Sequence, residues 1–394
     1  MDFSTLQTLD NTYVAHTYGR FPVAIKQGSG AVCTDSSGKQ YLDFTAGIGV
    51  NSLGFCSPQW VEAVSKQAAT LNHTSNLYYT EPGIVLAQKL CEKSCMKRVF
   101  FSNSGAEANE GAIKAARKYS FDAYGEGRYE IISLHNSFHG RTITTLAATG
   151  QAVFHTKFNP FTEGFVFAEA NNIESVKALV SEKTCAVMLE CIQGEGGVVP
   201  LEKEFVQAVA ALCQEKDLLL IIDEVQTGLG RTGSFFSYQQ FGVQPDIVSA
   251  AKGLGGGLPI GAVLFGEKTM DTMDAGTHGS TFGANPIVCA GANVVVDSLD
   301  DDFLSGVKEK SAFIFEKVAK FPHVQSVTGL GLMIGVSFDD GITGKQVVDK
   351  CLENGVLFLT AKTKLRMLPP LTITKDEIEQ GLSVLETVLT QWEG

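Results

Sequence analysis

An alternation of short apolar runs with helical patterns constrains the fold of this chain more than any other feature. Seven runs have the length of single strands and are rich in Val, Ile, Leu, Phe and Ala: 98–102, 129–134, 165–168, 186–189, 218–222, 247–250 and 262–265. Segments with helical spacing lie between several of them, as at 106–119 and 202–216. Parallel strands that are buried on both faces have this continuous apolar character, and helices supply their crossover connections. The pattern predicts an α/β fold with a mostly parallel sheet covered by helices on both faces.

The two ends of the chain carry different patterns. Up to about residue 42, turn signals alternate with short apolar pieces, which predicts an extended arm with small hairpins and a turn at 35–39. A helix is expected at 58–71, with a proline in its first turn. After about residue 285, two helical patterns precede strands at 329–338 and 355–359 and a last helix from Lys375. We therefore expect three parts: residues 1–45 as an arm and part of a small domain, 46–290 as the large domain, and 291–394 as a smaller α+β domain.

Composition argues against several classes of function. The formal net charge of −12 leaves no basic stripe for nucleic acid. The N-terminus has neither a basic start nor an apolar run, and no later stretch is long enough to span a bilayer, so we expect neither a secretory signal nor a membrane partner. Nine cysteines without a regular interval favour reduced thiols in a cytoplasmic protein. We also expect no metal, because Cys91 and Cys95 lack a second pair and no glutamate stands between His135 and His139.

Lys252 is the first candidate for chemistry, because it follows the apolar run at 247–250 and precedes a run of glycines. A lysine at the end of a segment is ordinarily solvated. Here Gly253 and the glycines at 255–257 allow the backbone to approach a bulky ligand closely. A lysine held against an apolar wall can lose its proton and act as a nucleophile toward carbonyl groups.

Polar residues follow five of the predicted strands, at the edge where open α/β sheets bind their ligands. We expect them to converge on one crevice; they are 103–105, 135–141, 190–195, 223–226 and Lys252. Ser104 and Gly105 precede a helix, whose start suits a phosphate, although Ser104 could equally be only a helix cap. Asp223 ends a fully apolar strand and so requires a cation. That cation is either a protonated pyridine nitrogen or an arginine or lysine in a salt bridge.

The segment GLGRTG at 228–233 matches the glycine spacing of a dinucleotide-binding loop, which would make the chain a nicotinamide dehydrogenase. A true fingerprint opens a helix directly after its strand, whereas five residues separate the run at 218–222 from Gly228. The SFFSYQQFG that follows is also a poor helix start. We therefore reject a dinucleotide site at this segment.

Nine ordered segments resemble the class III pyridoxal-phosphate aminotransferases, and the acetylornithine-type members most of all. They are GRFPVAI (19–25), YLDFTAGIGVNSLG (41–54), SNSGAEANE (102–110), NSFHGRT (136–142), IQGEGGV (192–198), DEVQTGLGRTG (223–233), PDIVSAAKGLGGGLPIGA (245–262), HGSTFGANP (278–286) and LRMLPPL (365–371). Together they extend over nearly the whole chain. The resemblance implies a fold type I enzyme with a seven-stranded sheet, active as a homodimer whose subunits share their sites.

The resemblance also implies a cofactor site. Lys252 would bind pyridoxal 5'-phosphate through a Schiff base and move the proton between cofactor and substrate, while Asp223 would keep the ring nitrogen protonated. The other cofactor-binding residues that it implies are Ser104, Gly105 and Ala106 at the phosphate, Thr281 of the partner subunit at the same group, Phe138 and Val225 on the two ring faces, Gln226 at the ring hydroxyl, and Glu224.

Two different substrates must share one pocket in such an enzyme, and the resemblance places two arginines there. Arg141 would hold the distant carboxylate of either substrate, with help from Tyr18 and Ser280. Arg366 would bind the near carboxylate of glutamate through a bidentate pair. Acetylornithine has no carboxylate at its reacting carbon, so Glu195 would neutralise Arg366 when that substrate is bound.

The expected reaction transfers the δ-amino group of N2-acetylornithine to 2-oxoglutarate, a step of arginine biosynthesis. Ile48 favours this donor, because ornithine-preferring relatives have a tyrosine at the matching position. Succinylornithine, ornithine and 4-aminobutyrate remain alternative donors, and a non-catalytic pyridoxal-phosphate protein is a further alternative. Phe55, Ser57 and Cys191 depart from the residues common in the family and leave the finer choice of donor open.

Overall fold

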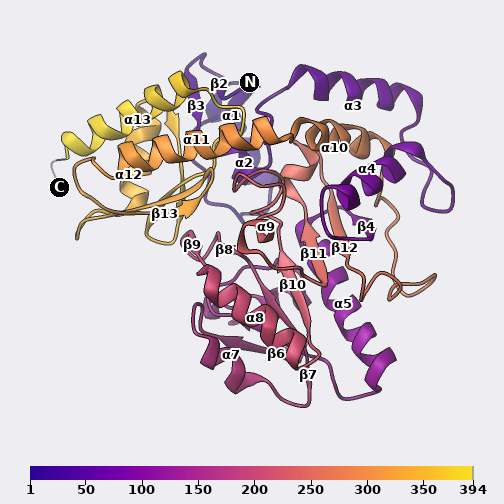
Figure 1. Cartoon of the computed structure of the whole chain (residues 1–394). Helices are drawn as coiled ribbons and strands as arrows, with labels where there is room; N and C mark the ends of the chain where they lie inside the picture. Colours follow the sequence, from indigo (N-terminus) through magenta and orange to yellow (C-terminus); the bar gives the residue numbers. More distant parts are fainter. Residues whose placement is uncertain (393–394) are drawn as a thin grey trace.

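A seven-stranded sheet forms the centre of the large domain in the computed structural model, which describes residues 1–392 (Figure 1). Its strands, in spatial order, are β4 (Arg98–Ser102), β12 (Gly261–Phe265), β11 (Ile247–Ala250), β10 (Leu219–Asp223), β7 (Thr184–Leu189), β5 (Glu130–Leu134) and β6 (Phe165–Ala168). Only β12 runs antiparallel to its neighbours, while the other pairs are parallel. The predicted mostly parallel sheet, with a strand at each of the seven apolar runs, is therefore confirmed.

Helices cover both faces of this sheet, as the continuous apolar runs predict. On one face, Leu219 and Ile221 pack with Ile113 of α5 (Gly105–Tyr124). On the other face, Leu220 and Ile222 belong to a cluster that includes residues of α8 (Lys203–Glu215). Successive residues of a strand point to opposite faces, so every position of β10 must be apolar until the strand reaches its polar end.

Shorter elements of the large domain complete its surface. They are α2 (Ala46–Gly49), α3 (Pro58–Thr70), α4 (Glu81–Glu92), α6 (Ile143–Ala148), η1 (Ala152–Phe154), α7 (Ile173–Leu179), the two-stranded β8 (Ile192–Gln193) and β9 (Val199–Pro200), α9 (Tyr238–Phe241), η2 (Lys252–Gly255) and α10 (Pro286–Ser298). The helix expected at 58–71 is confirmed, with Pro58 at its start. Helix α10 packs against α3 and α4.

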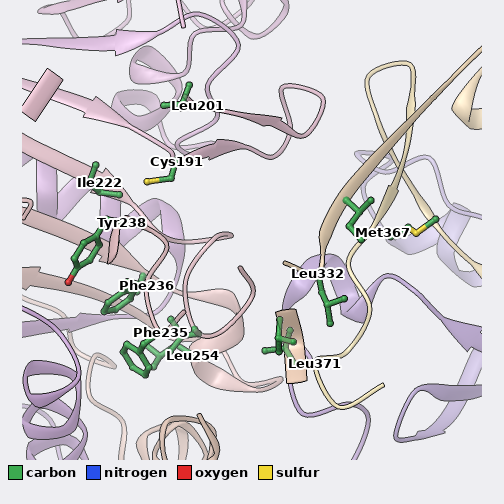
Figure 2. Packing of buried hydrophobic residues seen from close by; sticks show 14 of the residues in the cluster. Cys191, Leu201, Ile222, Phe235, Phe236, Tyr238, Leu254, Leu332, Met367 and Leu371 are labelled. Carbon is green, nitrogen blue, oxygen red and sulfur yellow. The ribbon is translucent and has the colours of Figure 1, made fainter. Parts of the chain in front are cut away.

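The C-terminal part is a second, smaller α+β unit. Its sheet has the order β13 (Val324–Leu330), β14 (Met333–Phe338), β17 (Lys364–Met367) and β16 (Leu359–Ala361), and its helices are α11 (Asp301–Val318), α12 (Gly344–Glu353) and α13 (Lys375–Thr390). The single strand expected at 329–338 is wrong, because a turn with Gly331 at φ +59° divides this stretch between two strands of a hairpin. Leu332, Met367 and Leu371 of this unit belong to the same apolar cluster as Ile222 of the large sheet, and Figure 2 labels these four side chains.

The first 45 residues contribute a third sheet, formed by β1 (Ile25–Ser29), β2 (Val32–Asp35), β3 (Gln40–Asp43) and the C-terminal strand β15 (Val356–Leu357). The predicted turn at 35–39 is confirmed, since the Asp35 carboxylate accepts hydrogen bonds from the N–H groups of Ser37 and Lys39. The strand expected at 355–359 is divided between two sheets, because β15 joins β3 and β16 joins β17. The division into three parts at residues 45 and 290 stays a prediction.

The extended conformation expected at the N-terminus is wrong for its first residues, where α1 (Phe3–Tyr13) forms a helix. The Asp2 side chain caps this helix by accepting a hydrogen bond from Thr5 N at 2.8 Å. No residue of α1 is buried. The turn signals that predict an extended arm lie after this helix, and Asp2 is the sequence signal for its start.

The GLGRTG segment forms no dinucleotide loop. No helix begins between Gly228 and Gly233, and the short α9 starts only at Tyr238, which agrees with the rejection of a fingerprint. The segment instead carries the buried Arg231, whose Nη1 donates to the carbonyls of Leu332 at 3.0 Å and Pro369 at 2.5 Å. Leu332 N in turn donates to the Arg231 carbonyl. Arg231 therefore links the large domain to the C-terminal unit, and burial lowers the pKa of its guanidinium to about 9.

Replacing Arg231 by Met should lower the free energy of unfolding by about 3 kcal/mol, because two buried carbonyl groups lose their donor. The urea midpoint is the measurement. Arg98→Met is the control, since Arg98 pairs with Asp271 on the surface, where an ion pair contributes at most about 1 kcal/mol. Equal midpoints for the two variants would contradict a structural role for Arg231.

Candidate active site

One cavity of about 440 Å³ lies beyond the carboxyl edge of the large sheet. Segments that follow β4, β5, β7, β10 and β11 all line it, which confirms that the polar strand ends converge. The predicted site residues among its lining are Ser104, Gly105, Ala106, Phe138, Arg141, Glu195, Asp223, Val225, Gln226 and Lys252. The sheet thus brings together residues that are up to 148 positions apart in the sequence, from Ser104 to Lys252.

Lys252 begins η2 directly after β11, in a left-handed conformation with φ +44°. Burial lowers the pKa of its amine, although the carboxylates of Glu195 and Asp223 favour the charged form. The glycines beside it serve packing as well as the cavity. A Cβ on Gly256 would lie 2.8 Å from Trp60 Nε1, and a Cβ on Gly253 would lie 2.6 Å from the Ser52 hydroxyl. Close approach of the backbone to a ligand, which the sequence predicts for these glycines, is therefore only part of their role.

Asp223 is buried at the end of β10 and accepts three hydrogen bonds. Its Oδ2 accepts from Asn109 Nδ2 at 2.7 Å and faces His139 Nδ1 at 2.8 Å, while its Oδ1 accepts from Val225 N at 2.9 Å. Burial disfavours charge on His139, but its hydrogen bond and attraction to Asp223 outweigh burial and raise its pKa. Neither an arginine nor a lysine pairs with Asp223 within residues 1–392. On the protein side, the group that faces this carboxylate is the His139 imidazole.

Asn109 and His139 were not predicted as site residues. Asn109 stands in the second turn of a helix, where a buried amide is easily taken for part of the packing. His139 lies in the range 135–141 that is expected at the crevice, but the sequence assigns it no role there. The signal that could have found both is physical: a buried carboxylate must receive hydrogen bonds, and the elements next to β10 must supply them.

Helix α5 begins at Gly105 and has Ser104 as its N-cap, with the Ser104 hydroxyl accepting from Glu107 N at 3.1 Å. The N–H groups of the first turn have no acceptor inside a helix, and they carry its partial positive charge. A Cβ on Gly105 would lie 2.6 Å from Val225 Cγ1, so only glycine allows this approach. Ser104 is therefore a helix cap, and the same helix start also offers an anion site at the cavity.

Glu190 and Phe138 form a second unpredicted contact at the cavity. The Glu190 carboxylate accepts a hydrogen bond from Phe138 N at 3.0 Å. Burial raises the Glu190 pKa to about 7, with the charge of His139 opposing the rise and Asp223 adding to it. The Glu224 side chain, in contrast, does not line the cavity, because it accepts hydrogen bonds from Thr227, Ser237 and Tyr238 N on the far side of the turn.

Arg366 reaches the cavity region from β17 of the C-terminal unit. It is only 3% exposed, and its Nη1 lies 2.5 Å from Glu195 Oε1 and 3.3 Å from Gln226 Oε1. Burial raises the Glu195 pKa, but the attraction and hydrogen bond from Arg366 outweigh this and lower it overall. Glu195 and Arg366 are therefore a charged, largely desolvated pair whose acidic member lines the cavity.

Besides Glu224 and Arg366, four predicted residues lie outside the cavity lining of this single chain. Tyr18 is 75% exposed beside Arg20, and Ile48 is 44% exposed, with Val50 in its place in the cavity lining. Ser280 and Thr281 line a separate hollow with Phe100. Ser280 still touches the site indirectly, since its hydroxyl accepts a hydrogen bond from Asn103 at 3.2 Å. Within residues 1–392, no group of three acidic, histidine or cysteine side chains is placed to hold a metal ion.

The free energy of unfolding of the ligand-free protein should depend on pH through Glu190. Its pKa is about 7 when folded, against 4.5 ordinarily, so between these values the native state keeps a proton that the unfolded chain has released. Stability from this group therefore falls as pH rises through that window. Glu190→Gln cannot titrate, and its stability relative to the parent should rise by up to about 3 kcal/mol between about pH 5 and pH 8.

Urea unfolding at these two pH values measures this difference. Glu182→Gln is the matched control, because Glu182 is exposed and should show no change with pH. A Glu190→Gln variant that follows the control would contradict a buried, protonated carboxyl at this position.

Known proteins are similar to this chain over nearly its whole length. The class III aminotransferase family model matches residues 13–389. An acetylornithine aminotransferase of Haemophilus ducreyi is 56% identical over 392 residues, which cover 99% of this chain and all of the relative. The crystal structure of an N-acetylornithine aminotransferase from Stenotrophomonas maltophilia matches with a TM-score of 0.84 and 35% identity, over 97% of this chain and 98% of that one.

An ornithine aminotransferase of Toxoplasma gondii, described with partial occupancy of pyridoxal phosphate at its active site, matches with a TM-score of 0.93 and 32% identity. The match covers 98% of this chain and 94% of that one. The family model and the Haemophilus ducreyi relative both extend over nearly the whole sequence, and the chain belongs to the class III aminotransferase family.

Proposed function

We propose that this chain transfers the δ-amino group of N2-acetyl-L-ornithine to 2-oxoglutarate, giving N-acetyl-L-glutamate 5-semialdehyde and L-glutamate in arginine biosynthesis. The Arg366–Glu195 pair at the cavity carries this proposal, because the site can present either a neutral ion pair or a free arginine to the substrate. The names of the relatives at highest identity support the same donor.

The residues of the cavity fit pyridoxal phosphate as the cofactor. When bound, this group supplies a carbonyl that condenses with an amine and a ring that takes up electrons from the reacting carbon. The start of α5 at Gly105 and Ala106 would hold the phosphate, and Phe138 and Val225 line the space for the ring. Gln226 would meet the ring hydroxyl.

Asp223 and Lys252 would handle the protons. The Asp223 carboxylate, which is hydrogen-bonded to Asn109, Val225 N and His139, would keep a proton on the ring nitrogen. The lowered pKa of Lys252 increases the share of neutral amine, which can bind the cofactor and take a proton from the substrate carbon. Burial therefore prepares Lys252 for both tasks.

Arg141 and Arg366 would divide the substrate carboxylates between them. Arg141 would bind the distant carboxylate that both substrates have. Arg366 keeps Glu195 as its partner when acetylornithine binds, and releases it for the near carboxylate of glutamate or 2-oxoglutarate. Without Glu195, the first substrate would leave a buried guanidinium without a counter-charge, which is costly.

A homodimer would complete the site. Tyr18, Ser280 and Thr281 lie outside the cavity of their own chain, which fits residues that reach a neighbouring subunit. Large apolar side chains also cluster in exposed positions nearby, as at Leu77, 87% exposed, and Tyr79, 97% exposed.

No described helix is long and apolar enough to cross a membrane. All nine cysteines are free, which supports a reducing compartment such as the cytoplasm.

The choice of amine donor is the direct test. We expect kcat/KM to be highest with N2-acetylornithine, lower with succinylornithine, and lowest with ornithine and 4-aminobutyrate. Lys252→Ala should abolish transfer from every amine and remove the cofactor absorbance that depends on this lysine, since no other amine lines the cavity among residues 1–392. A clear preference for free ornithine would refute the proposed donor, and a colourless protein that binds NAD would revive the dehydrogenase.

Glu195→Gln should affect the two half-reactions differently. The amide cannot neutralise Arg366, so the single-turnover rate with acetylornithine should fall by about tenfold or more, as expected for loss of a largely desolvated charge partner. The reaction with glutamate, which supplies its own carboxylate, should change much less. Stopped-flow absorbance of each half-reaction measures this, and equal losses in both would contradict the exchange of Glu195 for substrate.

A further inference from the structure

The two substrate arginines are held in different ways. Arg366 is buried and already paired with the carboxylate of Glu195. Arg141 is exposed at the cavity and has no carboxylate partner within residues 1–392. Its guanidinium carbon instead lies 4.2 Å from the ring centre of Phe154 and 5.4 Å from that of Phe138. Aromatic rings, not an acidic group, therefore orient Arg141.

Phe154 packs against Phe138, which forms part of the cavity wall. Its ring packs edge-on against Phe138, with 6.1 Å between ring centres and 73° between planes. The segment that carries it is fastened to the strand end before Phe138, because Gly150 N donates to the Ser137 hydroxyl and Gln151 Nε2 donates to the Ser137 carbonyl, both at 3.0 Å. Phe154 does not line the cavity itself. Any effect on a substrate must pass through Arg141 or Phe138.

An aromatic support has a consequence that an acidic one lacks. The face of a phenyl ring attracts a guanidinium and restricts its motion, yet it occupies none of the N–H donors and cancels none of the charge. A carboxylate at the same place would compete with the carboxylate of a substrate. Arg141 can thus stay available in both half-reactions, whereas Arg366 must be released from Glu195 for only one of them.

We propose that Phe154 is a positioning residue that sets the affinity of this site for the distant carboxylate of its substrates by stacking on Arg141. This inference rests on the proposed function, which assigns that carboxylate to Arg141. Phe154→Leu removes the ring and keeps an apolar side chain, whereas Phe154→Tyr keeps the ring. Phe158→Leu is the matched control, because Phe158 is 54% exposed and lies four residues further along the same segment.

Two probes separate positioning from general damage. The first compares N2-acetylornithine with N-acetyl-1,4-diaminobutane, the same amine without its carboxylate. In Phe154→Leu, kcat/KM should fall about three- to tenfold for the first amine, through KM, and stay unchanged for the second. Phe154→Tyr and Phe158→Leu should stay within about twofold of the parent for both amines. Equal losses for the two amines, or none for either, would overturn the inference.

The second probe is the binding of glutarate to the pyridoxal-phosphate-loaded enzyme, measured by calorimetry. This unreactive dicarboxylate can engage Arg141 and Arg366 together, so Phe154→Leu should raise its Kd about three- to tenfold and Phe154→Tyr should not. An unchanged Kd in Phe154→Leu would overturn the inference. A parent enzyme that accepts no amino group from N2-acetylornithine would refute the proposed donor instead, and glutarate would still decide the role of Phe154.

Discussion

The buried carboxylate of Asp223 is the group on which the arrangement of the site depends. It ends a strand whose residues are all buried, so it must receive hydrogen bonds from the protein around it. Asn109 brings in α5, and His139 brings in the loop after β5, so one carboxylate fixes the relative positions of three elements. The start of α5 and the Phe138 segment are consequently held together at the wall of the same cavity.

The charged groups around this carboxylate are held in place to different degrees. Asp223, His139 and Asn109 are buried and hydrogen-bonded, which suits a part that must not move. Among residues 1–392, the Glu195 side chain is hydrogen-bonded only to Arg366 and Gln226, at the cavity lining, which suits a part that is exchanged. The aromatic support of Arg141 lies between these cases, because it restricts direction without neutralising charge.

The contact between the large domain and the C-terminal unit depends on a residue whose role cannot be predicted from the sequence pattern. The glycine spacing of GLGRTG looked like a nucleotide loop, and its rejection rested on distance from the strand. What the segment does instead depends on Arg231, whose buried guanidinium donates to two carbonyls more than a hundred residues away. Those partners are carbonyl groups of the backbone, so no residue type in the sequence marks them.

The sequence by itself determined the sheet, because strands that are apolar at every position are stable only when both of their faces are buried. It also determined which polar residues would meet, because parallel strands end at one edge of the sheet. It could not indicate Asn109 or Phe154, nor the roles of His139 and Glu190, since their partners are defined by packing between distant elements. It also could not place Ile48 and Tyr18, which lie outside the cavity of their own chain. Tertiary structure decided these points, because hydrogen bonds and ring contacts require atoms within a few ångströms, and only the folded chain sets those distances.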